Sequence, residues 1–215
     1  MKFKELALFS GLYGFFAVIY KVLGFVVFLW IARTLSIDHY GTFGLLYAVQ
    51  TAFATFVISG ITEVSVGLFK DSVGESKYGN ISRNSNIAFL IYASALSIGA
   101  IIFYIIFQEY IRNTGESSTI LFAALSGLLL GYASLKSQIL RLQERHLDVQ
   151  IYSFLVPVIG LLFGSAGFYW NETIHSFFVY SSIGLFFGLL IFSSFNSINQ
   201  ENVSELRSIK KLLAG

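Results

Sequence analysis

The sequence predicts an all-α integral membrane protein with six transmembrane helices and both termini on the cytoplasmic side. Three observations support this fold class. The 215 residues are 55% hydrophobic and only 12% charged, whereas a soluble domain is about one quarter charged. Six long apolar runs alternate with polar clusters, and the basic residues gather in alternate connections. This pattern excludes a disordered protein, a nucleic-acid-binding domain and an ordinary soluble enzyme.

Each apolar run is long enough to cross a bilayer, because about 20 helical residues span the hydrocarbon core. The expected helices are Leu6–Ala32, Tyr40–Ile61, Ser85–Phe107, Thr119–Leu140, Val149–Trp170 and Ser176–Ser194. The first run is longer than the apolar region of a signal peptide and lacks a small-x-small cleavage site, so we expect an uncleaved helix. Residues 1–194 are then the bundle, and residues 195–215 form an amphipathic cytoplasmic tail.

Basic residues orient this bundle. Of the 14 Lys and Arg residues, 11 fall on one side, two (Arg33 and Arg112) fall on the other, and Lys21 lies within the first run. The 11 are Lys2, Lys4, Lys70, Lys77, Arg83, Lys136, Arg141, Arg145, Arg207, Lys210 and Lys211. Because basic residues concentrate in cytoplasmic loops, this side is expected to be cytoplasmic.

Lys21 is the main candidate for a functional contact, because a charge at the centre of a span costs about 2.5–3.5 kcal/mol. Small or aromatic residues lie within about 40° of it around the helix; they are Gly14, Ala17, Gly24, Phe28 and Ala32. We therefore expect Lys21 to face the bundle or a water-filled cavity. There it either contacts an anion or acts as a gating charge, or it pairs with a backbone carbonyl or with Glu63.

Four further residues are weaker candidates. Thr51 and Thr55 share a polar stripe on the second helix; they either contact a substrate or bond to the helix backbone and neighbouring helices. Arg33 suits a phosphate or a lipid headgroup, or serves as an interfacial anchor. Glu63 either forms an ion pair with a Lys or carries a coupling proton. Pro157, the single proline, predicts a bend in the fifth helix that is either static or a hinge.

Glycine spacing predicts close packing of the last three helices. The small-xxx-small pairs are Gly127 with Gly131, Gly160 with Gly164, and Gly184 with Gly188. No catalytic site, metal site or cofactor is expected, since the sequence has no cysteine, its three histidines are far apart, and it has no paired intramembrane carboxylates.

One stretch carries a family resemblance. Residues 32–44 read Ala-Arg-Thr-Leu-Ser-Ile-Asp-His-Tyr-Gly-Thr-Phe-Gly. This stretch resembles the first extracytoplasmic loop of bacterial polysaccharide (O-antigen type) flippases, with Ser36 in place of the usual glycine. Those flippases belong to the multidrug/oligosaccharidyl-lipid/polysaccharide transporter superfamily. The resemblance continues through residues 60–63, Gly-Ile-Thr-Glu, and the predicted topology is similar to one six-helix lobe of these two-lobe transporters.

The resemblance implies a multi-pass protein of the bacterial inner membrane that flips an undecaprenyl-pyrophosphate-linked oligosaccharide for cell-surface polysaccharide synthesis. Lys21 and Arg33 are reasonable contacts for the pyrophosphate. The expected partners are the lipid bilayer, this glycan, and a second transporter lobe or a second copy, with no nucleic acid. A truncated or split half-transporter is expected ahead of a half-size carrier. The alternatives are a non-transporting membrane interaction protein or inactive fragment, and a multidrug exporter of the same superfamily.

The topology makes a direct prediction. Because the chain has no cysteine, a single cysteine introduced at Gly115 should react with a membrane-impermeant maleimide from outside the cell, and one at Gly74 should not. The opposite labelling pattern would reverse the predicted orientation.

Overall fold

The computed structural model describes most of the chain. It covers residues 3–71, 118–142 and 145–213, together with residues 86–87, 89–91, 93–94, 96–98, 101–102 and 104–105. Every regular element within this part is helical, and no strand occurs there. This agrees with the predicted all-α class.

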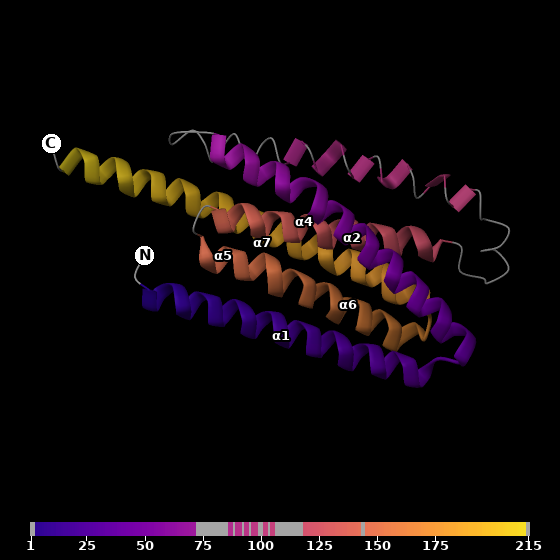
Figure 1. The fold of residues 1–215 in the computed structure, drawn as a ribbon. Helices are drawn as coiled ribbons and strands as arrows, with labels where there is room; N and C mark the ends of the chain where they lie inside the picture. The colour runs from indigo at the N-terminus through magenta and orange to yellow at the C-terminus, as the bar shows by residue number, and fades with distance from the viewer. Residues whose placement is uncertain are drawn as a thin grey trace.

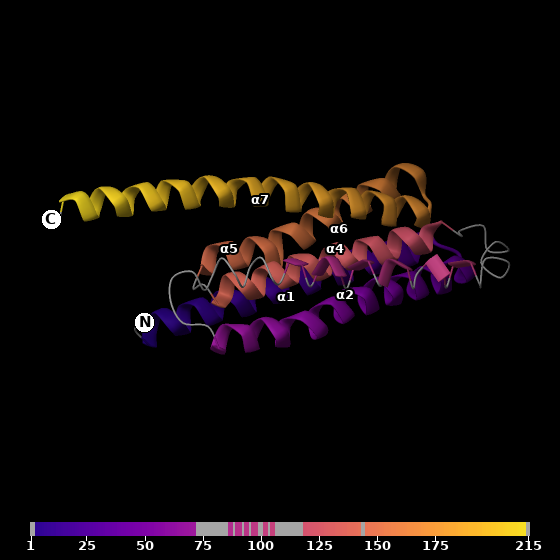
Figure 2. The ribbon, with the colours of Figure 1, turned by 90° about the horizontal axis from the view of Figure 1, so that it is seen from above.

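The named elements of the described part are six α-helices and one short π-helix. They are α1 (Phe3–Thr34), α2 (Ile37–Asp71), α4 (Thr119–Leu142), α5 (His146–Gln150), the π-helix η1 (Ile151–Leu155), α6 (Val156–Asn171) and α7 (Ile174–Leu213). The helices run alternately up and down the bundle, so α1 begins and α7 ends at the same end (Figures 1 and 2). The opposite end, where α1 passes into α2 and α6 passes into α7, is called the hairpin end below.

Five segments are long and apolar enough to cross a membrane, as in a multi-pass membrane protein. They are Gly14–Thr34, His39–Ser59, Thr119–Arg141, Asp148–Asn171 and Ile174–Ser193. Each of these segments overlaps one of the predicted spans. The third predicted span, Ser85–Phe107, lies only partly in the described part, where its described residues are helical. Their side chains at Phe89, Ala93 and Leu96 pack against a cluster around Val57 and Leu135.

Two helices extend well past their predicted ends. α2 continues from the predicted Ile61 to Asp71, and α7 continues without a break from the last predicted span to Leu213. Hydropathy marks only the apolar portion of a helix, whereas the backbone hydrogen bonds continue into polar sequence. Residues 195–213 therefore prolong the last span as one helix.

The fifth span is not a uniform α-helix. It consists of α5, η1 and α6 in succession, and in η1 the Val156 N–H bonds to the Ile151 carbonyl oxygen, five residues earlier. Pro157 follows at the start of α6 and has no N–H to donate to the preceding turn. The structure therefore has a widened π turn just before Pro157, where the sequence predicts a bend.

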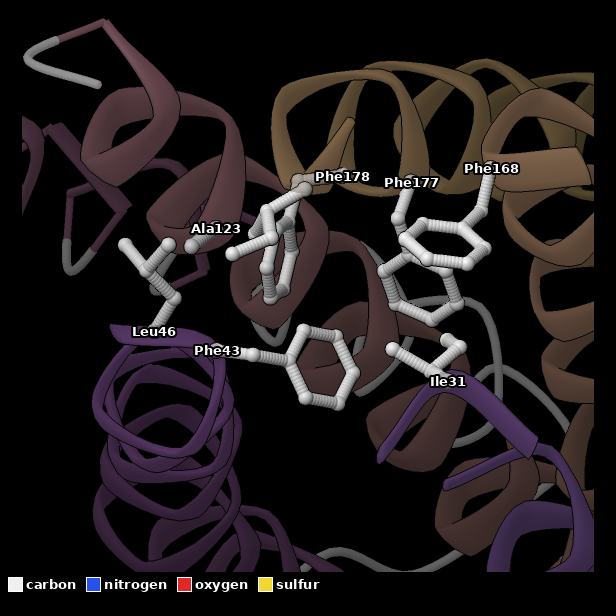
Figure 3. Close-up of a cluster of buried hydrophobic side chains, with 8 residues drawn as sticks. Ile31, Phe43, Leu46, Ala123, Phe168, Phe177 and Phe178 are labelled. Carbon is white, nitrogen blue, oxygen red and sulfur yellow. The ribbon is translucent and has the colours of Figure 1, made fainter. Parts of the chain in front are cut away.

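Aromatic residues close the bundle at the hairpin end. The ring of Phe43 from α2 lies 5.4 Å from that of Phe177 and 6.0 Å from that of Phe178, both from α7. Around these rings pack Ile31 of α1, Ala123 of α4 and Phe168 of α6 (Figure 3). We call this group the aromatic hub. The two other buried clusters among the described residues contain no residue of α1.

The predicted glycine pairs lie at helix contacts. A Cβ on Gly127 of α4 would meet the Gln50 carbonyl oxygen of α2, and one on Gly131 would lie 2.7 Å from Val57 Cβ. A Cβ on Gly184 of α7 would lie 2.7 Å from Phe163 Cβ of α6. Such distances are too short for real atoms, so only glycine lets these backbones approach so closely. The close-packing prediction is confirmed for α2 against α4 and for α6 against α7.

The glycine contacts predict unequal responses to alanine. Gly127→Ala should destabilise the bundle by about 1–3 kcal/mol, because its methyl group would push α4 away from a rigid backbone atom of α2. Gly188→Ala is the control, since its Cβ would lie at an ordinary 3.5 Å from Val156 Cγ1. Thermal unfolding in detergent measures both variants. Equal melting temperatures for the two would contradict the packing described.

Candidate functional site

A cavity of about 480 Å³ lies at the level of the membrane spans. Its walls come from α1, α2, α4, η1, α6 and α7. The lining residues are Tyr20, Lys21, Gly24, Val27, Phe28, Phe43, Tyr47, Gln50, Thr51, Ala54, Thr55, Ile58, Leu130, Ser134, Ser153, Pro157, Leu161, Phe177, Ser181 and Leu185. Along α2 the lining runs from Phe43 to Ile58, about 22 Å at the helical rise of 1.5 Å per residue. The cavity therefore follows most of a membrane's hydrocarbon thickness.

The cavity exists because α1 and α2 pack against different partners. α1 lies against α5, η1 and α6, whereas α2 lies against α4. The fully buried Ile31 of α1 packs in the aromatic hub. Nearer the start of α1, the ring of Phe16 lies 4.8 Å from the ring of Phe154 in η1. Only 6% of the apolar segment of α1 is buried inside the structure, whereas 56% of the apolar segment of α4 is buried. Between its two attachments, α1 forms one wall of the cavity with Lys21 and Gly24.

Lys21 and Gln50 lie at about the same depth. Lys21 precedes the last residue of α1 by 13 positions, and Gln50 follows the first residue of α2 by 13. Because the two helices form an antiparallel hairpin (Figure 1), each lies about 20 Å from the hairpin end. Both line the cavity. An ammonium group and an amide group therefore line the same open cavity near the middle of the membrane.

The two threonines of the predicted stripe also line the cavity, but their hydroxyl protons are already used. Thr51 donates to the Tyr47 carbonyl oxygen at 2.9 Å, and Thr55 donates to the Thr51 carbonyl oxygen at 2.8 Å. Each hydroxyl oxygen keeps lone pairs that accept hydrogen bonds. In this conformation Thr51 and Thr55 offer acceptors to the cavity, which suits a hydroxyl or ammonium donor better than a phosphate oxygen.

The irregular part of the fifth span opens onto the same space. Ser153 of η1 and Pro157 of α6 both line the cavity. π-helical turns inside α-helices are frequent at functional sites, and here the turn places a serine on the cavity wall. Pro157, predicted as a hinge candidate, thus lies beside the predicted substrate contacts.

The remaining two predicted residues do not join this group. Arg33 is exposed in the last turn of α1 and is absent from the cavity lining. Glu63 belongs to α2, but its side chain lies outside the described residues. The cavity therefore brings together Lys21, Thr51, Thr55 and Pro157, and leaves Arg33 at the hairpin end.

Besides Ser153, sequence reasoning did not nominate Gln50, Ser134 and Ser181 of the cavity wall. Gln50 lies on a different face of α2 from the threonines, and the serines belong to α4 and α7, where small residues are typical of packing. A polar residue at mid-span was the available signal for Gln50.

Comparisons of the chain with protein-family models, curated proteins and solved structures give no match. The functional argument therefore depends on the cavity and its side chains.

The cavity can be tested by filling it. A Cβ on Gly24 would meet nothing within 4 Å, so Gly24→Leu should fold normally and place its side chain in the cavity. In a Thr51→Cys background, this substitution should slow labelling by a water-soluble maleimide by about an order of magnitude, because the thiol reacts as a hydrated thiolate.

Gly14→Leu is the matched control, since Gly14 lies on the same helix with equal space around it but outside the cavity lining. Equal labelling rates with both leucine variants would show that Thr51 is not reached through this cavity.

Proposed function

We propose that the chain is a transport protein that moves a lipid-linked oligosaccharide across the membrane for cell-surface polysaccharide synthesis. The observation that carries this proposal is the position of Lys21 on a cavity that follows the membrane spans. An ammonium group at mid-span is costly in lipid, and it is stabilised when an anionic group enters the same space. The loop resemblance at residues 32–44 supplies the substrate class, an undecaprenyl-pyrophosphate-linked glycan.

The physical problem in such transport is the polar headgroup. A pyrophosphate and several sugars cannot cross hydrocarbon unaided, because each unpaired polar group costs several kcal/mol there. A cavity with a cation, hydroxyl groups and aromatic rings replaces part of their hydration. The polyprenyl chain, which is apolar, remains in the bilayer.

The proposed membrane is the bacterial inner membrane, with both chain ends in the cytoplasm. The segregation of basic residues supports this orientation. The common location of the two ends in the bundle (Figures 1 and 2) agrees with an even number of spans. Arg33 then lies at the outer surface, where it suits an anionic headgroup.

A second wall completes the proposed path. In this chain Lys21, Thr51 and Thr55 are all exposed, and lipid is a poor neighbour for a charged side chain. A second transporter lobe or a second copy of the chain covers these residues in the proposed transporter. Substrate then passes between the two halves.

Removing or reversing the charge of Lys21 should strongly reduce this activity. In cells whose surface polysaccharide depends on this gene, Lys21→Met and Lys21→Glu should reduce surface glycan about tenfold or more, since a hydrogen bond to a charged group contributes about 1.5–3 kcal/mol. Immunoblotting of the glycan and of membrane-inserted protein measures both quantities.

Lys136→Met is the matched control. Lys136 is also within a span, but its ammonium lies 5.2 Å from the Tyr132 ring centroid and is not part of the cavity lining. It should retain near-normal glycan. Normal glycan in both Lys21 variants at wild-type protein levels would remove Lys21 from the mechanism and leave the proposal without its main support.

A further inference from the structure

The buried polar side chains of the described bundle fall into two groups. Five of the seven make hydrogen bonds within the protein, namely Thr119, Ser126, Ser137, Ser176 and Ser182. The other two, Gln50 at 5% exposure and Ser181 at 3%, make no side-chain hydrogen bond to a described residue. Both line the cavity. Two buried polar residues whose side chains have no hydrogen-bond partner among the described residues therefore share one cavity.

The polar atoms of these two side chains keep access to the cavity, since the fully enclosed side-chain polar atom without a partner in the described part is Asn86 Oδ1. A ligand in the cavity can therefore bond to Gln50 and Ser181 without displacing a protein partner. We propose that Gln50 and Ser181 form a subsite for a neutral, hydroxyl-rich sugar ring, distinct from the contact that Lys21 makes with an anion. This inference rests on the proposed function and names the residues that select the glycan.

The chemistry of the wall favours a sugar over a second anionic group. The Gln50 amide offers both donors and an acceptor, which pair with hydroxyls that do both. Thr51 Oγ1 and Thr55 Oγ1 offer acceptors only, since their protons bond to α2 carbonyls. Acceptors repel phosphate oxygens and attract sugar hydroxyls.

Aromatic rings supply the rest of the subsite. Phe28 and Tyr47 line the cavity beside Gln50, with ring centroids 6.4 Å apart, and the Tyr47 side chain is exposed. The carbon-bound hydrogens of a pyranose ring form an apolar face that packs on such rings. Binding sites of this kind combine an aromatic surface with a few placed polar groups that set orientation and specificity.

A buried group that pairs with a substrate hydroxyl also discriminates. When the hydroxyl is missing, the protein group is left unpaired, and the analogue is rejected far more strongly than a lost apolar contact would require. Gln50 is therefore expected to determine which sugar is accepted, while Lys21 responds to the phosphate that all such lipids share.

The test uses the full chain in lipid nanodiscs with two separate probes. Saturation-transfer NMR detects binding of the neutral disaccharides maltose, lactose and chitobiose, and calorimetry detects inorganic pyrophosphate. At least one disaccharide should bind the wild type. Gln50→Leu should weaken that binding about tenfold or more, as loss of a hydrogen bond of about 1.5 kcal/mol gives, and Ser181→Ala should weaken it severalfold. Neither should change pyrophosphate binding, which Lys21→Met should abolish.

Gln138→Leu is the matched control, because it makes the same substitution on α4 at a residue outside the cavity lining. It should bind the disaccharide as the wild type does. Thermal melting checks folding, and Ser181→Ala, which adds no volume, keeps the test valid where Gln50→Leu does not fold.

Two results would overturn the subsite: no disaccharide binds the wild type, or Gln50→Leu and Ser181→Ala both bind it unchanged. The proposed function fails differently. Disaccharide binding that depends on Gln50, together with normal surface glycan in the Lys21 variants, would support the subsite and refute the transport mechanism.

Discussion

The packing of Phe43 against Phe177 and Phe178 joins α2 to α7 at the hairpin end, beyond the direct packing of α4 against α7. Through this hub, α1 and α2 are fixed at one end, and each then follows its own neighbours, α6 on one side and α4 on the other. Glycine contacts keep α2 close to α4 and α6 close to α7. Helix α4 also packs against α7, so α2, α4, α6 and α7 form one packed group, and the cavity lies where α1 has few contacts with α2 and α4. The cavity is thus a consequence of where the close contacts lie.

Polar side chains in the spans differ in whether their own helix satisfies their hydrogen bonds. Most hydroxyl groups bond to a carbonyl oxygen of their own helix, as Thr51, Thr55 and Ser165 do, and this satisfies them without any neighbour. Lys21 has no comparable local solution, because an ammonium group carries three donors and a full charge. Gln50 is enclosed where α2 meets α4 and still reaches the cavity. Lys21 and Gln50 are therefore the two residues at which a ligand in the cavity has hydrogen-bonding groups to bind.

Local sequence signals were sufficient for the class, for most helix positions and for the glycine contacts, since hydropathy and residue size act through single helices and pairs. The inward position of Lys21 followed from its neighbours Gly24 and Phe28, which line the cavity with it. Gly14 shares that face but is absent from the cavity lining, because the cavity does not extend that far along α1. The enclosure of Gln50 depends on the close approach of Gly127 from α4, a tertiary contact that no pattern within α2 contains. Pro157 marked a break in its helix but not the π-helical form that the break takes.

Helix α7 has one more consequence. It starts in the aromatic hub and continues for 40 residues without interruption, which is about 60 Å, or twice the hydrocarbon thickness of a bilayer. At this length, a tilt of 5° would displace the far end of the helix by about 5 Å. Because α7 packs along α6 and α4 within the spans, the length beyond the bundle carries the position of those helices well past the hydrocarbon region.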